Sequence, residues 1–270
     1  MLLDVRIAAF LLFLTGMLIP GACAQTPAAP AGRSAPNAAQ QQTPATIPAA
    51  AQAAPQTEPP QQRTGLRMVV LDPAHGGTDP GARGTGGMRE SELVLSFAAQ
   101  IRAALEKQGF SVLLTRQGND NPSFDDRAAM ANAQRGAVFI TLHIGSTGLP
   151  GSVRVYTLPD FPAAAPAPGR LLPWDRAQAA ALPLSRRLAE LAQAEFSQRF
   201  KGSPSSAQTA PVRQLRSLAL PAIAVELSSV SVEDSAVLEQ MGPDVASALA
   251  RAVAEFKAVY DAAQVPGAQP

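Results

Sequence analysis

The chain has 270 residues, a formal net charge of +1, a single cysteine and only 5% aromatic residues. Charges of both signs are interleaved, which excludes the basic surface by which many proteins bind nucleic acid. One cysteine cannot form an internal disulfide, so a hydrophobic core must stabilise the fold.

Residues 1–24 have the pattern of a secretory signal peptide. An apolar stretch at 7–19 is shorter than the ~20 residues of a membrane span, and ACA at 22–24 fits the small-x-small pattern of a signal-peptidase site. We therefore expect a mature chain that begins near Gln25, carries no membrane span and is exported, either periplasmic or in the cell envelope. Two alternatives remain open: an uncleaved N-terminal anchor, and a lipoprotein anchored through Cys23, although a proline stands three positions before that cysteine.

A disordered linker is expected at residues 25–65. Between residues 25 and 62, 28 of the 38 residues are Ala, Pro or Gln, and apolar periodicity is absent. Such a segment cannot bury enough surface to offset the entropy of ordering, and it is typical of a flexible tether with polyproline II character. The rest suits one domain, expected at residues 66–262, with a flexible tail at 263–270.

Within this domain, apolar strand-like segments alternate with segments of helical period. A strand at 67–73 precedes a helix whose apolar residues recur every four positions from Leu93 to Leu105, ending at Gly109. Ser123, with Asp126 three residues later, opens a second helix that runs to about residue 135. Further strands are expected at residues 110–116, 137–143, 151–158 and 221–228, and further helices at 184–200 and 243–260.

These strands are continuously apolar rather than alternating, which indicates a sheet covered on both faces. We therefore predict an α/β fold, a three-layer α/β/α domain with a mostly parallel sheet. In such sheets, functional sites form beyond the carboxyl ends of the strands. His75 and His143, the chain's two histidines, both stand at such ends, beside glycines that allow close approach. Each histidine alone is more often an ordinary hydrogen-bonded residue.

Two carboxylates make a site at this edge more specific. Glu90 follows a glycine-rich loop directly before the first helix, where it could also act only on the helix dipole. Glu226 lies in the apolar segment PAIAVELS, and burying it is costly unless it is paired, near a metal or beside a cavity; a water-facing strand end is the alternative. Two histidines and one carboxylate form many catalytic zinc sites, and a further carboxylate can serve as general base.

Four segments, in order, resemble zinc-dependent N-acetylmuramoyl-L-alanine amidases: VVLDPAHGGTDPGARGTGGMRESELVL, LLTR, DDRAAMANAQRGAVFITLH and LPAIAVELSS. The resemblance extends over about residues 66–260 and implies one zinc ion (Zn2+) per chain in a surface groove. It implies His75, Glu90 and His143 as metal ligands and Glu226 as the catalytic glutamate. The implied reaction is hydrolysis of the amide between N-acetylmuramic acid and L-alanine of peptidoglycan, the expected partner.

The chain departs from the family pattern at positions around these residues. Members usually have glycine where Ala74 stands, lysine at Ser91 and asparagine at Gly145, and a different segment from the LSSVS at 227–231. None of these changes removes a ligand or the base, so they bear on substrate preference and rate more than on zinc binding. A non-catalytic peptidoglycan-binding module with an amidase-like fold, and a zinc hydrolase of another amide, remain alternatives.

Other matching residues are expected to have supporting roles. Asp72 and Asp79 either fix the loops around the first histidine or simply form turns beside prolines. Arg116, Arg127 and Asn132 are expected to be structural supports.

The segment at 159–178 is rich in proline in its first half, which forbids a continuous helix there. Some family members carry a helix at this point that plugs the zinc site until an activator removes it. We instead expect a loop at 159–175 that rims the groove, or a plain surface loop, and no obligatory activator.

Overall fold

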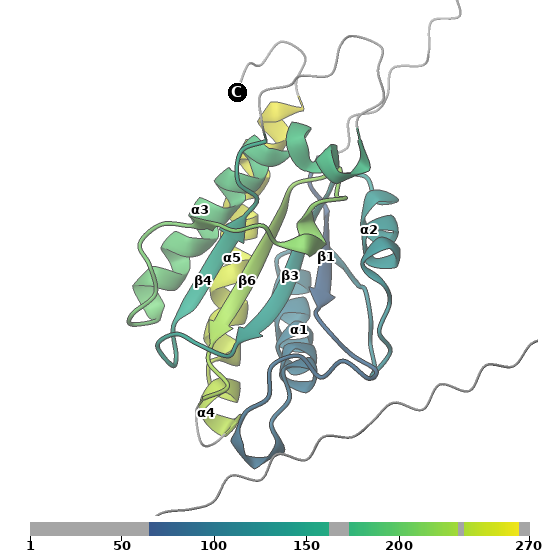
Figure 1. Cartoon of the computed structure of the whole chain (residues 1–270). Coiled ribbons are helices and arrows are strands. Elements are labelled where there is room, and N and C mark those ends of the chain that lie inside the picture. Colours follow the sequence, from purple (N-terminus) through teal and green to yellow (C-terminus); the bar gives the residue numbers. More distant parts are fainter. Residues whose placement is uncertain (1–64, 162–172, 232–234, 265–270) are drawn as a thin grey trace, which may run out of the picture. The chain divides into compact units, whose positions relative to one another are not determined.

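The computed structural model describes residues 65–161, 173–231 and 235–264 (Figure 1). The expected signal peptide, nearly all of the expected linker and most of the expected tail lie outside these residues, as does most of the loop at 159–175. Within the described ranges, no helix is both long enough and apolar enough to cross a membrane.

One sheet of six strands, in the order β2-β1-β3-β6-β4-β5, forms the centre of the domain (Figure 1). Its strands are β1 (Met68–Pro73), β2 (Ser111–Leu114), β3 (Ala137–Gly145), β4 (Val153–Thr157), β5 (Gln208–Thr209) and β6 (Ala222–Ser228). The neighbouring strands β2 and β1, β1 and β3, and β3 and β6 pair in parallel, whereas β4 runs antiparallel to β6. The predicted mostly parallel sheet is therefore confirmed.

Helices cover the two faces of this sheet unequally. The α-helices are α1 (Glu90–Lys107), α2 (Phe124–Asn132), α3 (Leu182–Arg199), α4 (Ser235–Glu239) and α5 (Gly242–Ala263). Short 3-10 turns are η1 (Thr85–Gly87), η2 (Trp174–Ala180) and η3 (Arg213–Leu215). The long helices α1 and α3 pack on the sheet and α5 packs on both of them, whereas α2 contacts β3 and η3.

The alternation of side chains along β1 shows which face each helix covers. Val69 and Leu71 belong to the large core cluster that contains the apolar side chains of α1, α3 and α5. Val70, between them, belongs to a smaller cluster with Ala128 and Ala131 of α2. Because successive strand residues point to opposite faces, α2 lies on the face opposite the three long helices. The predicted three-layer fold is confirmed, with one thin layer.

The thinly covered face carries the polar residues of the strands. Asp72, His143 and Glu226 stand two or four positions beyond members of the smaller cluster, on β1, β3 and β6. By the same alternation they face the α2 side, at the carboxyl ends of their strands. Apolar packing at the start of each strand therefore fixes the orientation of the polar residues at its end.

The expectation of uniformly apolar strands is wrong for two strands. β2 lies at the edge of the sheet and is exposed or half-buried along its length. In β4, Val153 and Val155 are buried, while Arg154 and Tyr156 alternate with them and are half-buried. These two side chains are directed to the face with the thin helical layer, where water reaches the sheet.

Local hydrogen bonds fix two of the element boundaries. Ser123 Oγ accepts from the Asp126 N–H, and Asp126 accepts from the Ser123 N–H, which confirms the predicted start of α2 as a capping box. At the other boundary, the N–H of buried Leu66 donates to Asp261 Oδ1 at 2.7 Å, so the first described residues are held by α5.

Candidate metal centre

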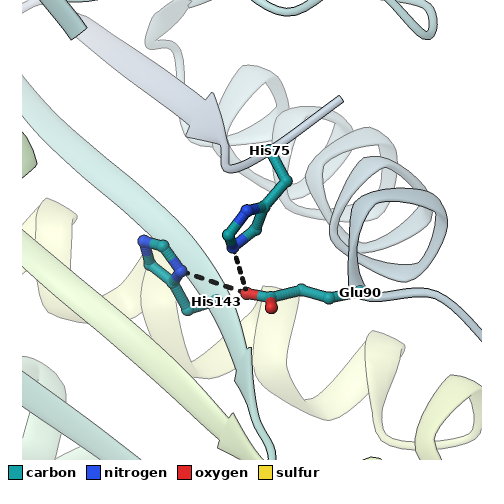
Figure 2. Close-up of side chains that lie close together, drawn as sticks. All are labelled: His75, Glu90 and His143. Carbon is teal, nitrogen blue, oxygen red and sulfur yellow. Dashed lines mark hydrogen bonds and ion pairs between the residues drawn. The ribbon is translucent and has the colours of Figure 1, made fainter. Parts of the chain in front are cut away.

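Three side chains from separate elements converge at the carboxyl edge of the sheet, as Figure 2 shows. Glu90 Oε1 lies 3.1 Å from His75 Nε2 and 3.0 Å from His143 Nδ1. His75 follows β1, Glu90 is the first residue of α1 and His143 belongs to β3. One ligand atom from each residue lies within 4.8 Å of the others. We call these three residues the His–Glu–His cluster.

The loop after β1 holds His75 in a left-handed backbone conformation, with φ of 64°. Its carbonyl oxygen accepts from Arg127 Nη2 at 2.8 Å, and the Pro73 carbonyl accepts from Arg116 Nε at 2.7 Å. Gly81 passes so close that an added Cβ would lie 2.5 Å from Glu90 Oε2. Buried guanidinium groups and a required glycine therefore hold the loop against the cluster.

Glu90 is 4% exposed and accepts hydrogen bonds through both oxygens. The Ala82 N–H donates to Oε2 at 2.7 Å, and the Ile144 N–H donates to Oε1 at 2.9 Å. Burial opposes ionisation, but hydrogen bonds from His143, His75 and the Ala82 N–H together hold the pKa of Glu90 well below its usual range. The cluster therefore contains a buried carboxylate that stays anionic at neutral pH.

His75 has carboxylates on both ring nitrogens. Its hydrogen bond to Glu90, opposed by burial and supported by Asp79, raises the pKa of His75 to about 9. Asp79 Oδ2 lies 2.8 Å from His75 Nδ1, and this contact lowers the pKa of Asp79. A carboxylate behind a histidine fixes the orientation of the ring, an arrangement common behind metal ligands.

Asp72 supports the loop indirectly. It is fully buried, and it accepts from the Thr115 hydroxyl and from Arg127 Nη1, each at 2.5 Å, and from the Thr141 hydroxyl at 2.8 Å. Arg127 also donates to the backbone of the loop that carries His75. Arg127 is thus a structural support, as expected, and Asp72 provides its charge partner.

His143 is bounded on its other side by neutral groups. The side-chain amide of Gln214 lies 3.1 Å from His143 Nε2, and Thr141 Oγ1 lies 3.4 Å from the same atom. Gln214 belongs to η3, so this turn directly adjoins the cluster.

Glu226 stands beside the cluster on the neighbouring strand. In the parallel register of β3 and β6 it is paired with His143, and its side chain is 29% exposed. Its Oε1 accepts from Arg154 Nη1 at 3.2 Å and from the Tyr156 hydroxyl at 3.3 Å. Glu226 is therefore a paired, partly exposed carboxylate near the carboxyl end of an interior strand, and it does not face open water alone.

The cluster has the donor set of a zinc site. Two imidazole nitrogens and one carboxylate oxygen suit zinc, whereas magnesium and calcium prefer all-oxygen surroundings. Three protein ligands leave a coordination position for water or substrate, as in catalytic rather than structural zinc sites. The partly exposed carboxylate of Glu226 lies on the same face of the sheet.

A family model for N-acetylmuramoyl-L-alanine amidases matches residues 69–256 of the chain. The chain belongs to this family. Similar curated amidases include AmiC of Neisseria meningitidis serogroup B, 40% identical over 87 residues, and AmiA of Escherichia coli K12, 39% identical over 79 residues. These matches cover 32% and 29% of this chain, and 21% and 27% of the two relatives. The aligned part is thus less than a third of either relative's length.

Solved amidase structures share the fold over a larger part of the chain. AmiC2 of Nostoc punctiforme has a TM-score of 0.54 at 24% identity, covering 72% of this chain and 98% of that one. Ami1 of Mycobacterium smegmatis has a TM-score of 0.56 at 20% identity, covering 72% and 97%. The amidase fold of the domain is therefore shown independently of the short segments of higher identity.

The positions at which this chain departs from the family pattern lie around the site. Ala74 is buried within the His75 loop, where its carbonyl accepts from Arg116 Nη2 at 2.9 Å, and the carbonyl of buried Ser91 accepts from the same guanidinium at 2.7 Å. Gly145 lies beside Glu226, where an added Cβ would be 3.1 Å from its carboxyl carbon. Two of these residues are therefore held by the buried Arg116 guanidinium, and the third leaves room for the Glu226 side chain.

Three neighbours in the candidate site were not singled out from the sequence. Arg154 and Tyr156 carry a weak signal, since polar residues at alternate positions of VRVYT indicate a strand with one wetter face. Gln214 has no such signal, because only the folded position of η3 brings it to His143. Asn132, expected as a support, donates to the Ser217 carbonyl and accepts from the Ala219 N–H.

Proposed function

We propose that this chain is an exported, zinc-dependent N-acetylmuramoyl-L-alanine amidase. It cleaves the amide between the lactyl group of N-acetylmuramic acid and L-alanine in peptidoglycan. The observation that supports this proposal most is the His–Glu–His cluster with a fourth, partly exposed carboxylate, Glu226, on the adjacent strand. Membership of the amidase family supports the same reaction. The presence of Glu226 argues against a non-catalytic binding module, because binding alone would not need a general base.

In this proposal His75, Glu90 and His143 hold the zinc ion. When bound, zinc lowers the pKa of water toward about 7 and polarises the scissile carbonyl. The anionic Glu90, buried and hydrogen-bonded to two backbone N–H groups, supplies charge that favours a dication at the cluster. Asp79 holds the His75 ring from behind through Nδ1.

Glu226 acts as the base that moves the proton. It accepts a proton from the attacking water, whose oxygen bonds to the lactyl carbonyl carbon, and returns it to the alanine nitrogen as the C–N bond breaks. Arg154 and Tyr156 both contact Oε1, which leaves Oε2 of the carboxylate for this proton. The products are a lactyl carboxylate on the glycan and a stem peptide with a free amino terminus.

A defined substrate tests this proposal. The zinc-loaded protein is incubated with a synthetic muramoyl pentapeptide, and new amino termini are identified by mass spectrometry. We expect L-alanine to be the only new amino terminus and chelation of zinc to abolish its appearance. Cleavage at another bond would make the protein a zinc hydrolase of a different amide.

A further inference from the structure

A cavity of about 410 Å³ opens directly beside the His–Glu–His cluster. Its walls include His75, Phe124 at the start of α2, and Arg213 and Gln214 of η3. This volume lies within the range of small-ligand sites. We propose that the cavity binds the stem peptide beyond the scissile amide and that Arg213 binds a carboxylate of that peptide. The inference rests on the proposed amidase function and names the substrate feature that the site recognises.

Within the part of the chain that the structure describes, the Arg213 side chain is held in place by stacking rather than by its hydrogen-bond donors. Its guanidinium carbon lies 4.5 Å from the centroid of the Phe124 ring, a stacked arrangement that leaves the N–H groups at the edge of the plane free. The next residue but one, Leu215, is fully buried, and η3 packs against α2 and β6. The turn is therefore anchored while its arginine lies at the cavity wall.

Among the described residues, Arg213 makes no ion pair, and the other charges of the cavity already have partners. Arg127 pairs with Asp72 in the interior. Asp79 contacts His75 and accepts from the Gly81 N–H. Arg213 is thus the cation of this cavity that has bonding capacity for a ligand.

The chemistry of peptidoglycan indicates which part of the substrate meets this cation. The glycan is neutral once the lactyl carboxyl is in amide linkage, whereas the stem peptide carries free carboxylates beyond L-alanine. Gln214, adjacent to Arg213 in the chain, contacts His143 of the cluster, so a peptide whose first amide lies at the cluster has its next residues beside Arg213. A guanidinium binds a carboxylate through two parallel hydrogen bonds, which gives the contact direction as well as affinity.

The test measures binding rather than turnover. The zinc-loaded full chain carrying Glu226→Gln, which is expected to be inactive, is titrated calorimetrically with two muramoyl peptides. The two differ only in whether the carboxylates beyond L-alanine are free or amidated. We expect the free acid to bind roughly tenfold more tightly, and Arg213→Gln to remove that preference by weakening the free acid alone. Arg213→Lys, which keeps the charge, should retain part of the preference.

Arg216→Gln provides the matched control, because Arg216 immediately follows the same turn, is also exposed and lines a different cavity. It should leave both affinities unchanged. Equal effects of Arg213→Gln on the two peptides, or no effect on either, would overturn the inference. The two proposals can also fail separately. If Arg213 gives the free-acid preference but the unmodified protein, which keeps Glu226, hydrolyses no peptidoglycan, the carboxylate contact stands and the amidase proposal is overturned.

Discussion

At the scale of single residues, Glu90 Oε1 is the atom that both histidines approach. If the cluster binds zinc, His75→Ala, Glu90→Ala and His143→Ala each remove one of three ligands and should sharply reduce zinc bound per chain. Elemental analysis of the purified proteins measures this directly. Glu92→Ala is the matched control, since Glu92 lies in the same first turn of α1 but is exposed and pairs with Arg89. Full zinc occupancy in the His143→Ala protein would refute the assigned site.

Glu226 is expected to move protons without binding the metal. Glu226→Gln keeps the size of the side chain and its contact with Arg154, so the fold and the zinc content should be unchanged. Hydrolysis should fall by about two to four orders of magnitude, the usual loss when general-base catalysis is removed. Steady-state rates and zinc content are measured on the same preparation. Loss of zinc, or a rate equal to that of the unmodified protein, contradicts this role.

The raised pKa of His75, about 9, has a consequence for the stability of the zinc-free protein. The folded-state pKa exceeds the ordinary value near 6.5, so protonated His75 stabilises the fold fully below about pH 6.5. That contribution is lost as pH rises through about 9. We expect the unfolding free energy to fall by roughly 1–3 kcal/mol over this interval. Urea denaturation at several pH values measures it, and a zinc-free His75→Ala protein should lack this component of the pH slope.

At the scale of secondary-structure elements, the buried Arg127–Asp72 pair links α2 to the end of β1. Removing the cation leaves a fully buried carboxylate without its charge partner, which typically costs about 3–5 kcal/mol. We expect Arg127→Met to lower the unfolding free energy by that amount in urea denaturation. Arg135→Met, at an exposed position after α2, should change it by no more than about 0.5 kcal/mol.

The double variant Asp72→Asn with Arg127→Met separates loss of the pair from loss of packing. Because it removes both charges, it should recover part of the stability lost in Arg127→Met. If the double variant instead has a lower unfolding free energy than Arg127→Met, the unpaired buried charge of Asp72 is not the reason why Arg127→Met is destabilised.

The elements differ in how far the sequence predicts them. Apolar side chains at three- or four-residue spacing are sufficient to predict α1 and α5, and the Ser123–Asp126 pattern is sufficient to predict the start of α2. The two-residue β5 and the short α4 carry no periodic signal, because such short segments do not complete a repeat.

In the candidate site, too, some features can be predicted from short stretches of sequence and others depend on how distant strands pair. Histidines at strand ends are visible in the sequence, and their convergence follows from the parallel register of β1 and β3. The contact of Arg154 with Glu226 is not visible, because it depends on β4 pairing antiparallel beside β6. Such pairings are set by the whole sheet rather than by any local pattern.

At the scale of the whole molecule, the expected export and the expected tether concern residues that the structure does not describe, and both stay predictions. The same holds for the absence of an activator. If the proposed function is right, the purified protein should act on intact peptidoglycan without any added partner.

Digestion of purified sacculi tests the central claim most directly. The zinc-loaded protein alone is incubated with sacculi, and the soluble products are identified by mass spectrometry, with Glu226→Gln as the inactive control. We predict free stem peptides with N-terminal L-alanine from the unmodified protein and none from the control. Soluble fragments that retain muramic acid on the peptide, or no release by a protein with full zinc occupancy, would contradict the claim.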